Sequence, residues 1–444
     1  MTEGNILRKI GIFAIPCILT RVFQNLYNLI DSAMVGQVFG VASLAAVGIA
    51  GSIMSLFNDT FLGLVSGFSV VAAKKYGAGD SAGVKKTFVN ALFITSFFGV
   101  AFSLIGAVFA REMLVLMQTP EENMADAMKY TVVVFLGMWS MVFYNFFAEM
   151  LRAVGNSKMP LIFLIFSFVF HALLNVVLLF WFDAGVAGAA FSTVISQVAS
   201  VVLCVVYTDR KISCFRIKKE DIKIDFESAR ECMRMGIPMA VTNFVVTFGV
   251  IILSFVSNKM GTEYIAGYSC ASKIGYIITS PIFGLAAAVS VFVSQNVGAL
   301  KFDRVKHGVR QTLLFTTGVN IVLFLITKLI ERPLLSYLLS GDEVGTEAGL
   351  LYLDIRICAM FVLAFAAVFK NVTSSLGKPF FPMISGFLEI AVRYVIPLTL
   401  TSVLGFAAVP LTDAITWTML ALFLTPAYIY EFNKLKKGAD THEE

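Results

Sequence analysis

The chain has 444 residues, of which 58% are hydrophobic and 14% are charged, and it carries a net charge of +5 with a mean hydropathy of +0.83. A water-soluble fold of this composition would expose large apolar areas, so the composition favours a membrane protein. The basic residues are scattered over short segments without an aromatic-interleaved patch, which argues against nucleic acid as a partner.

Apolar runs recur along the whole chain, and each is long enough to cross about 30 Å of hydrocarbon as a helix. They lie near residues 10–34, 45–73, 87–110, 127–148, 159–182, 186–208, 232–257, 264–297, 311–329, 348–371, 380–402 and 410–431. The sequence therefore predicts an all-α membrane protein with twelve transmembrane helices.

The two halves of the chain repeat one pattern. Residues 63–91 are similar to residues 284–312 at an offset of 221, and Pro16 falls on Pro238 at an offset of 222. Transporters use such duplications to place a substrate path between two halves. We therefore expect two homologous six-helix lobes, 1–208 and 232–437, a cytoplasmic linker, 209–231, and a polar tail, 438–444.

Basic residues gather in alternate connectors. When the N-terminus is assigned to the cytoplasm, that side holds 25 of the 34 Lys and Arg residues, and the opposite connectors hold five. Because cytoplasmic loops are enriched in Lys and Arg, this bias predicts that both termini lie in the cytoplasm.

Polar residues interrupt the first predicted span near its outer end. Gln24, Asn28 and Asp31 are spaced i, i+4 and i+7, so they share one helix face, and Tyr27 belongs to the same polar run. A carboxylate inside a span is costly and is a candidate functional group. Asp31 can take up a proton or hold a transient Na⁺ with amide oxygens. Packing of this polar face against a neighbouring helix would explain the same pattern.

Two further charges lie near mid-depth in the N-terminal half: Arg21 in the first span and Asp59 in the second. Intramembrane charges usually find a partner, so we expect Arg21 and Asp59 to pair. The pair would serve either as a static fixture or as a proton-gated latch. Asp59 is also a candidate for cation coupling beside Asp31.

The C-terminal half carries Lys273 in its eighth span and Glu389 and Arg393 in its eleventh. Glu389 and Arg393 are four residues apart and share a helix face. We expect a cluster of these three residues with a net positive charge. Such a cluster would be structural, would hold a carboxylate ionised or would repel a cation from this lobe.

No motif for a metal, a nucleotide or a catalytic nucleophile is recognisable. The six cysteines show no CxxC spacing, and the three histidines are dispersed. The sequence therefore predicts no enzyme, no cofactor and no resident metal, and an ion gradient as the source of energy.

The chain resembles the multidrug and toxic compound extrusion (MATE) transporters, in detail bacterial members nearer the DinF-like branch. The resemblance rests on QNLYNLIDSAMVGQVFGVASLAAVGIA (24–50), the turns YGAGD and VGAL, RAVGNSKMPL (152–161) and GVAGAAFSTVISQ (185–197). It implies two six-helix lobes around a V-shaped cavity, and export of an organic, often cationic and amphipathic substrate in exchange for inward H⁺ or Na⁺. We accordingly expect a monomer in the bacterial inner membrane, with small organic compounds and membrane lipid as its partners.

The resemblance also bears on single residues. It places the coupling cation at Asp31 and adds Asn175, in the fifth span, to the candidate site. Some relatives carry an Asp where this chain has Leu179, so a second carboxylate at that point is absent. The seventh span also lacks the acidic residue of NorM-like members.

Two other functions fit parts of the pattern. A lipid-linked oligosaccharide flippase of the same superfamily also has duplicated helices, but it should carry a strongly basic cavity, whereas only Arg21, Lys273 and Arg393 lie deep in the spans. A membrane-embedded enzyme is the second alternative, and the missing nucleophile and metal motifs argue against it.

Overall fold

The computed structural model describes residues 1–116, 119–182, 184–257 and 262–440, except for the side chains of residues 27–50, 180, 254–257, 262–263 and 440. The described chain is helical and contains no strand. Its helices are α1 (Ile6–Gly77), α2 (Ser81–Val108), α3 (Ala110–Leu116), α4 (Glu121–Ala153), α5 (Lys158–Val176), η1 (Val177–Trp181), α6 (Gly185–Lys211), η2 (Ser213–Phe215), η3 (Lys219–Asp221), α7 (Phe226–Ser257), α8 (Thr262–Gly298), α9 (Phe302–Leu338), α10 (Glu343–Ser375), α11 (Phe380–Leu404), η4 (Gly405–Ala407) and α12 (Ala408–Asp440).

The predicted all-α membrane fold is confirmed. Among the described residues, ten helical segments are long and apolar enough to cross a membrane. One of them, Phe380–Ala439, contains the last two predicted spans, and Gly51–Gly77 is the second half of α1. The first predicted span lies in the first half of α1, so the fold is consistent with twelve spans.

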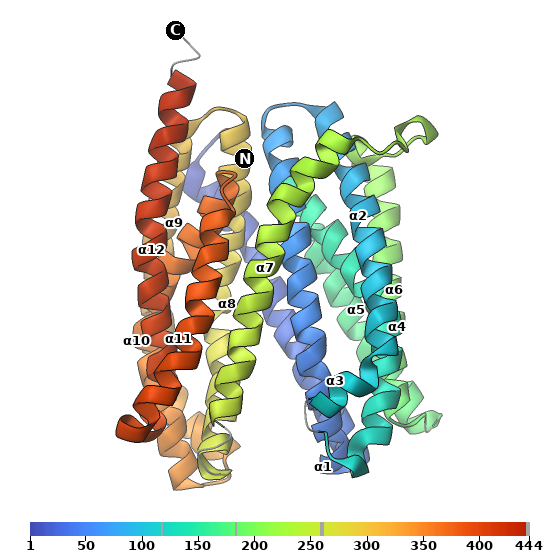
Figure 1. Ribbon diagram of the computed structural model, residues 1–444, viewed down its shortest axis with the longest axis vertical. Helices are drawn as coiled ribbons and strands as arrows, with labels where there is room; N and C mark the ends of the chain where they lie inside the picture. The colour runs from blue at the N-terminus through green and yellow to red at the C-terminus, as the bar shows by residue number, and fades with distance from the viewer. Residues whose placement is uncertain (117–118, 183, 258–261, 441–444) are drawn as a thin grey trace. The chain divides into compact units, whose positions relative to one another are not determined.

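Packing divides the chain into two compact units. The N-terminal unit is residues 19–240, and the C-terminal unit combines residues 1–18 with 241–444. The boundaries fall inside α1 and α7, whereas the sequence repeat divides the chain at the connector 209–231. Residues 6–18, which begin the first helix of the N-terminal half, therefore belong to the C-terminal unit. Residues 226–240, which begin the first helix of the C-terminal half, belong to the N-terminal unit. The long helices of both units are labelled in Figure 1.

Close helix contacts in the N-terminal unit depend on glycine. A Cβ on Gly67 of α1 would lie 2.5 Å from Cα of Gly236 on α7, and a Cβ on Gly63 would lie 2.4 Å from the carbonyl oxygen of Met239. These distances leave no room for a side chain. The opening segment of α7 is thus held against the second half of α1, while α4 packs on α2 and α6.

The C-terminal unit uses the same contact. A Cβ on Gly284 of α8 would lie 2.5 Å from a side-chain carbon of Ile18 on α1. Gly284 is the repeat counterpart of Gly63, so the glycine contact occurs in both units. The start of α1 is also buried in the core here, through Ile10, Phe13 and Cys17. Around it, α10 packs against α8, α9 and α12.

The connector between the halves docks on α2. Phe215 stacks on Phe88 with ring centroids 4.4 Å apart. Nζ of Lys85 lies 3.0 Å from Oδ2 of Asp221. Asp225 pairs with Lys86, the next residue of α2, at 3.2 Å. The connector is therefore fixed to the N-terminal unit by one aromatic contact and two ion pairs.

Candidate functional site

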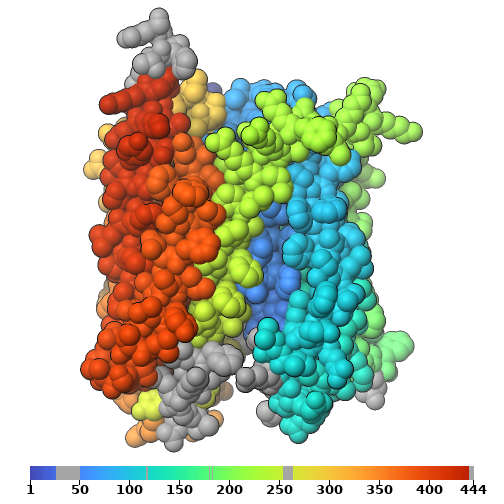
Figure 2. All heavy atoms as spheres, in the orientation of Figure 1, coloured from blue at the N-terminus to red at the C-terminus, as the bar shows by residue number. Residues whose placement is uncertain are grey.

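Helix α11 buries its two charged residues and exposes many of its large apolar ones. Its buried residues form a single stripe at helical spacing, Pro382, Ser385, Gly386, Glu389, Arg393 and Pro397. Large apolar side chains such as Phe387 and Leu398 are exposed instead. This pattern suits a helix with lipid on its outer face. In Figure 2, α11 and α12 form one face of their unit in orange and red.

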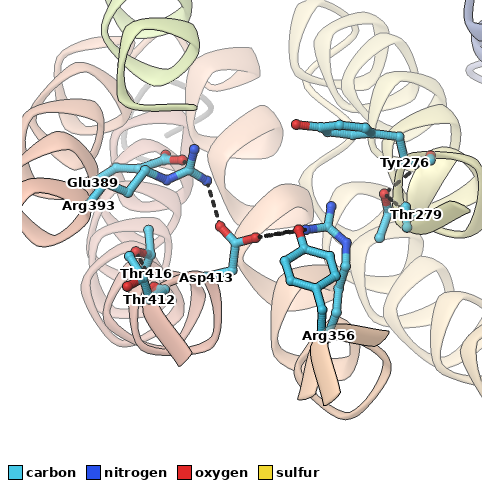
Figure 3. A network of polar contacts seen from close by, with 10 residues as sticks. Tyr276, Thr279, Arg356, Glu389, Arg393, Thr412, Asp413 and Thr416 are labelled. Atoms are coloured by element: carbon cyan, nitrogen blue, oxygen red, sulfur yellow. Dashed lines mark hydrogen bonds and ion pairs between the residues drawn. The ribbon is translucent and has the colours of Figure 1, made fainter. Parts of the chain in front are cut away.

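Three charged side chains meet on the inner face of α11. Nη2 of Arg393 lies 3.0 Å from Oε1 of Glu389 and 3.2 Å from Oδ1 of Asp413 on α12. All three residues are about 95% buried. The i, i+4 pair that the sequence predicts is therefore present, and Asp413 is added to it (Figure 3).

The other oxygen of Asp413 binds a second guanidinium. Nη1 of Arg356, on α10, donates to Oδ2 of Asp413 at 2.7 Å and to the hydroxyl of Tyr352 at 2.9 Å. The Arg356 guanidinium also lies 5.0 Å from the ring of Trp417 and 5.4 Å from that of Tyr276. These cation–π contacts stabilise a desolvated cation further.

Glycines on two neighbouring helices leave space for the arginine stems. A Cβ on Gly275 of α8 would lie 2.6 Å from Nε of Arg356, and a Cβ on Gly249 of α7 would lie 3.1 Å from Cδ of Arg393. Five helices of the C-terminal unit thus shape this network. We call Arg356, Asp413, Arg393 and Glu389 the C-unit charge network.

Lys273 is not part of this network. Its side chain is exposed on α8, whereas Gly275, two residues further on, faces Arg356. Two residues correspond to about 200° around a helix, so the two positions point in opposite directions. The expected cluster of Lys273, Glu389 and Arg393 therefore needs correction.

The predicted residues of the N-terminal unit lie on two helices, α1 and α5. Gln24, Arg21 and Asp59 of α1 are half-buried. Asp59 accepts from the amide of Asn58 at 3.4 Å, and Asn58 in turn accepts from Asn145 of α4 at 2.8 Å. Pairing of Arg21 with Asp59 stays a prediction. Tyr27, Asn28 and Asp31 lie outside the side chains that the structure describes.

Asn175 lies in a buried polar network between α5 and α6. Its amide oxygen accepts from Oγ of Ser192, and its amide nitrogen lies 3.1 Å from Nε2 of His171. Nε2 of His171 also lies 3.2 Å from Oγ1 of Thr193. Asn175, His171 and Ser192 are at most 1% exposed. The sequence shows only that the three histidines are dispersed, and nothing in it indicated this network around His171.

Sequence reasoning also missed Asp413 and Arg356. Both lie close to the ends of predicted spans, where a charge is easily assigned to the interface. A sequence signal for Asp413 was available, because it is spaced by four residues from the apolar Val409 and Trp417 and so shares a helix face with them. All three side chains are buried in the structure. Within the described part of the chain, no group of three or more His, Cys, Asp or Glu residues is placed to hold a metal ion.

The C-unit charge network has little capacity to bind a further cation. Its two carboxylates already contact two guanidiniums at 2.7 to 3.2 Å. An added cation would be repelled inside a region of low dielectric constant. The arrangement is suited to holding α10, α11 and α12 together.

Known proteins resemble both halves of the chain. Residues 16–177 and residues 238–399 each match the MatE family. The chain is 29% identical over 350 residues to the probable multidrug resistance protein YoeA of Bacillus subtilis (strain 168), which covers 77% of this chain and 75% of that protein. It is 24% identical over 385 residues to the probable multidrug resistance protein NorM of Thermotoga maritima, with 85% and 82% covered.

Solved structures share the fold. A crystal structure of MATE in complex with MaL6 and the structure of a MOP superfamily transporter from Pyrococcus furiosus Vc1 each superpose with a TM-score of 0.90. Each is 20% identical, and each match covers 98% of both chains.

Proposed function

The chain belongs to the MatE family, and we propose on this premise that it exports small organic compounds, cationic and amphipathic ones above all, in exchange for inward H⁺ or Na⁺. Members of this family are transporters and not enzymes, and two relatives that match most of the chain are named multidrug resistance proteins. The identity of the coupling ion and the class of exported compound are what we propose beyond membership of the family.

The proposal depends on one observation: both carboxylates of the C-unit charge network already have guanidinium partners. Asp413 and Glu389 already contact guanidiniums at 2.7 to 3.2 Å, so neither is available to a coupling cation. This supports a coupling site in the N-terminal unit. We assign it to Asp31, with Asn28, Gln24 and Tyr27 on the same helix and Asp59 as a second acid.

Asn175 is assigned to the same site. Helix α1 touches α5 where Phe23 meets Phe168, with ring centroids 5.7 Å apart. Asp31 follows Phe23, and Asn175 follows Phe168, by about two helical turns each. We therefore expect position 31 of α1 and position 175 of α5 to lie at similar depth.

We place the protein in the bacterial cytoplasmic membrane as a monomer with both termini in the cytoplasm. The excess of Lys and Arg in alternate connectors supports this orientation. A lipid-linked oligosaccharide flippase is less well supported, because the guanidiniums of Arg356 and Arg393 that a pyrophosphate would need are taken by Asp413 and Glu389.

Uptake of a fluorescent organic cation into proteoliposomes tests the proposal. The wild type should transport when a pH gradient or a Na⁺ gradient is imposed, and Asp31→Asn should lose the gradient-driven part. Glu122→Gln serves as the matched control, because this exposed acid lies at the start of α4. Undiminished gradient-driven transport by Asp31→Asn, at equal reconstitution, would overturn the assignment of Asp31.

A further inference from the structure

Five charged side chains gather near the end of α9 and the start of α10. We call them the α9–α10 charge cluster: Lys328, Glu331, Arg332, Glu347 and Asp354. Together with Leu350 and Leu351 they line a pocket of about 500 Å³. When all five are ionised, two cations face three acids and the cluster has a net charge of −1. A ligand that balances the acids must therefore bring a positive group.

The two cations are shared unequally among the acids. Arg332 pairs with Glu347 alone. Nζ of Lys328 contacts Oδ1 of Asp354 and also lies 2.9 Å from Oε1 of Glu331. One ammonium thus serves two carboxylates, and two carboxylates that are held this close repel each other.

Glu331 is the buried acid of the cluster. It is 6% exposed, and its Oε2 accepts no hydrogen bond from the described residues. A buried carboxylate oxygen without a donor is costly. Asp354, by contrast, is 45% exposed, and Arg332 and Glu347 are 67% and 63% exposed. A ligand can therefore reach these three residues, whereas Glu331 needs its donor from inside the cluster.

A second pocket of about 500 Å³ adjoins the cluster between α10 and α12. Its surface is largely apolar, and Asp354 lines both pockets. The other residues that line it are Ile355, Cys358, Ala359, Ala414 and Thr418. A single ligand that contacts Asp354 can therefore place a polar part in one pocket and an apolar part in the other.

The residues of α10 follow the same polarity. Glu347, Leu351, Asp354 and Cys358 are spaced by four, three and four residues, so they form one stripe along the helix. The stripe is charged near the helix start and apolar further in, over about 16 Å. This is the polarity of a phospholipid, with a charged headgroup and an apolar chain.

Both pockets lie at the same surface of the membrane. Lys328 is the next-to-last residue of the predicted span 311–329, Glu347 directly precedes the predicted span 348–371, and Ala414 lies near the start of the last predicted span. The charged pocket is therefore at the level of lipid headgroups, and the apolar pocket is at the level of hydrocarbon.

We propose that the two pockets bind one phospholipid with a primary ammonium in its headgroup, phosphatidylethanolamine. The ammonium donates to Asp354 and Glu347, so that three cations balance three acids. The phosphate lies on the solvent side and accepts from the exposed guanidinium of Arg332. One acyl chain lies in the apolar pocket. Lys328, which no longer serves Asp354, directs its donors to both oxygens of Glu331.

The same chemistry discriminates against other headgroups. Phosphatidylglycerol would add a negative charge to a cluster that is already negative, without a compensating cation. The ammonium of phosphatidylcholine carries three methyl groups and has no N–H to donate to the carboxylates. We therefore expect the full chain to retain phosphatidylethanolamine about tenfold more strongly than either of these lipids.

Native mass spectrometry of the full chain in detergent, with the three lipids added at matched acyl length, measures this preference. Asp354→Asn should reduce the retention of phosphatidylethanolamine to that of phosphatidylcholine. Asp303→Asn is the matched control, because this exposed acid pairs with Lys436 at the other end of α9. Equal retention of all three lipids, a preference for phosphatidylglycerol, or a preference that survives in Asp354→Asn would overturn the proposal.

Two further measurements test the apolar pocket. Thr418→Phe changes an exposed residue and fills the pocket without touching the charge cluster, so it should also abolish the preference. A diazirine in the acyl chain of phosphatidylethanolamine should crosslink to peptides that contain residues 354–359 and 414–418. Crosslinks confined to other segments, or an unchanged preference in Thr418→Phe, would overturn the assignment of the chain to this pocket.

Competition identifies other occupants. Free phosphoethanolamine should not displace the lipid at an equal concentration, and displacement would show that the headgroup binds without the apolar pocket. Displacement by an equal concentration of tetraphenylphosphonium would assign the site to an organic cation instead. A dimer that is lost in Thr418→Phe would assign this face to a second copy of the chain. Each of these three results would overturn the proposal, and none depends on an imposed ion gradient.

Discussion

Nη1 of Arg356 lies 2.7 Å from Oδ2 of Asp413, and this pair joins α10 to α12 inside the C-terminal unit. The second oxygen of the same carboxylate contacts Arg393 of α11. One buried acid therefore connects three helices. Loss of this carboxylate should therefore lower the stability of the whole C-terminal unit.

Asp413→Asn should destabilise the folded protein strongly. The variant leaves two buried guanidiniums with one fewer negative charge, and breaking a buried ion pair costs about 3–5 kcal/mol. Thermal unfolding in detergent, followed by the tryptophan fluorescence or by the monodisperse fraction after heating, measures the loss. Glu389→Gln should cost less, because Arg393 retains Asp413 and the amide oxygen of the variant still accepts a hydrogen bond.

A double-mutant cycle measures the coupling energy between Arg356 and Asp413. If Arg356 and Asp413 act together, Arg356→Met combined with Asp413→Leu should be less destabilising than either single change. Additive losses would argue against coupling between the two side chains.

Gly275→Ala should displace Arg356. The new Cβ would lie 2.6 Å from Nε of that arginine, and forcing a methyl group into a packed site costs about 1–3 kcal/mol. Gly318→Ala on α9 is the matched control, because a Cβ there meets nothing within 4 Å. Equal melting temperatures of the two variants would contradict the tight contact on α8.

Exchange of Arg21 and Asp59 tests the predicted pair on α1. Either single reversal, Arg21→Asp or Asp59→Arg, should abolish transport, because it places two like charges at mid-depth. The double reversal should restore part of the transport, as measured by growth of a pump-deficient host on dyes. Failure of the double variant at normal abundance would remove the pair from the mechanism.

Acid should release the connector from α2. The backbone N–H of Lys218, first, and the side chain of Lys85 hold the pKa of Asp221 below its ordinary value. Because this pKa is lowered in the folded state, the contact contributes above the unfolded-state pKa and is lost as the pH falls through the folded-state pKa. Limited proteolysis between residues 209 and 231 should therefore accelerate in acid. Asp221→Asn should be cleaved faster at neutral pH, with a smaller dependence on pH.

Local spacing in the sequence was enough to predict some of these features. The apolar runs predicted the helices, and the four-residue spacing of Glu389 and Arg393 predicted their contact. Partners from distant helices could not be predicted in this way. Arg356 and Asp413 are 57 residues apart, and their contact depends on how α10 packs on α12. The exposure of Lys273 depends in the same way on the rotation of α8 about its axis.

The division of the repeat raises a similar point. Sequence similarity divides the chain at the connector, because that is where one copy ends. Packing divides it inside α1 and α7, because Gly67 and Gly284 admit the neighbouring backbone closely. Similarity between the two repeats does not show with which unit the first residues of α1 and α7 will pack.

The division of the chain inside α1 and α7 determines the order in which the two units can be completed during translation. Every segment of the N-terminal unit has been synthesised once residue 240 is made. Residues 10–17, among the first to emerge, belong to one hydrophobic cluster with residues of α8 and with Leu420 and Leu424 of α12, which are among the last to be made. The cluster that buries the earliest segment of the polypeptide is therefore completed only near the end of translation.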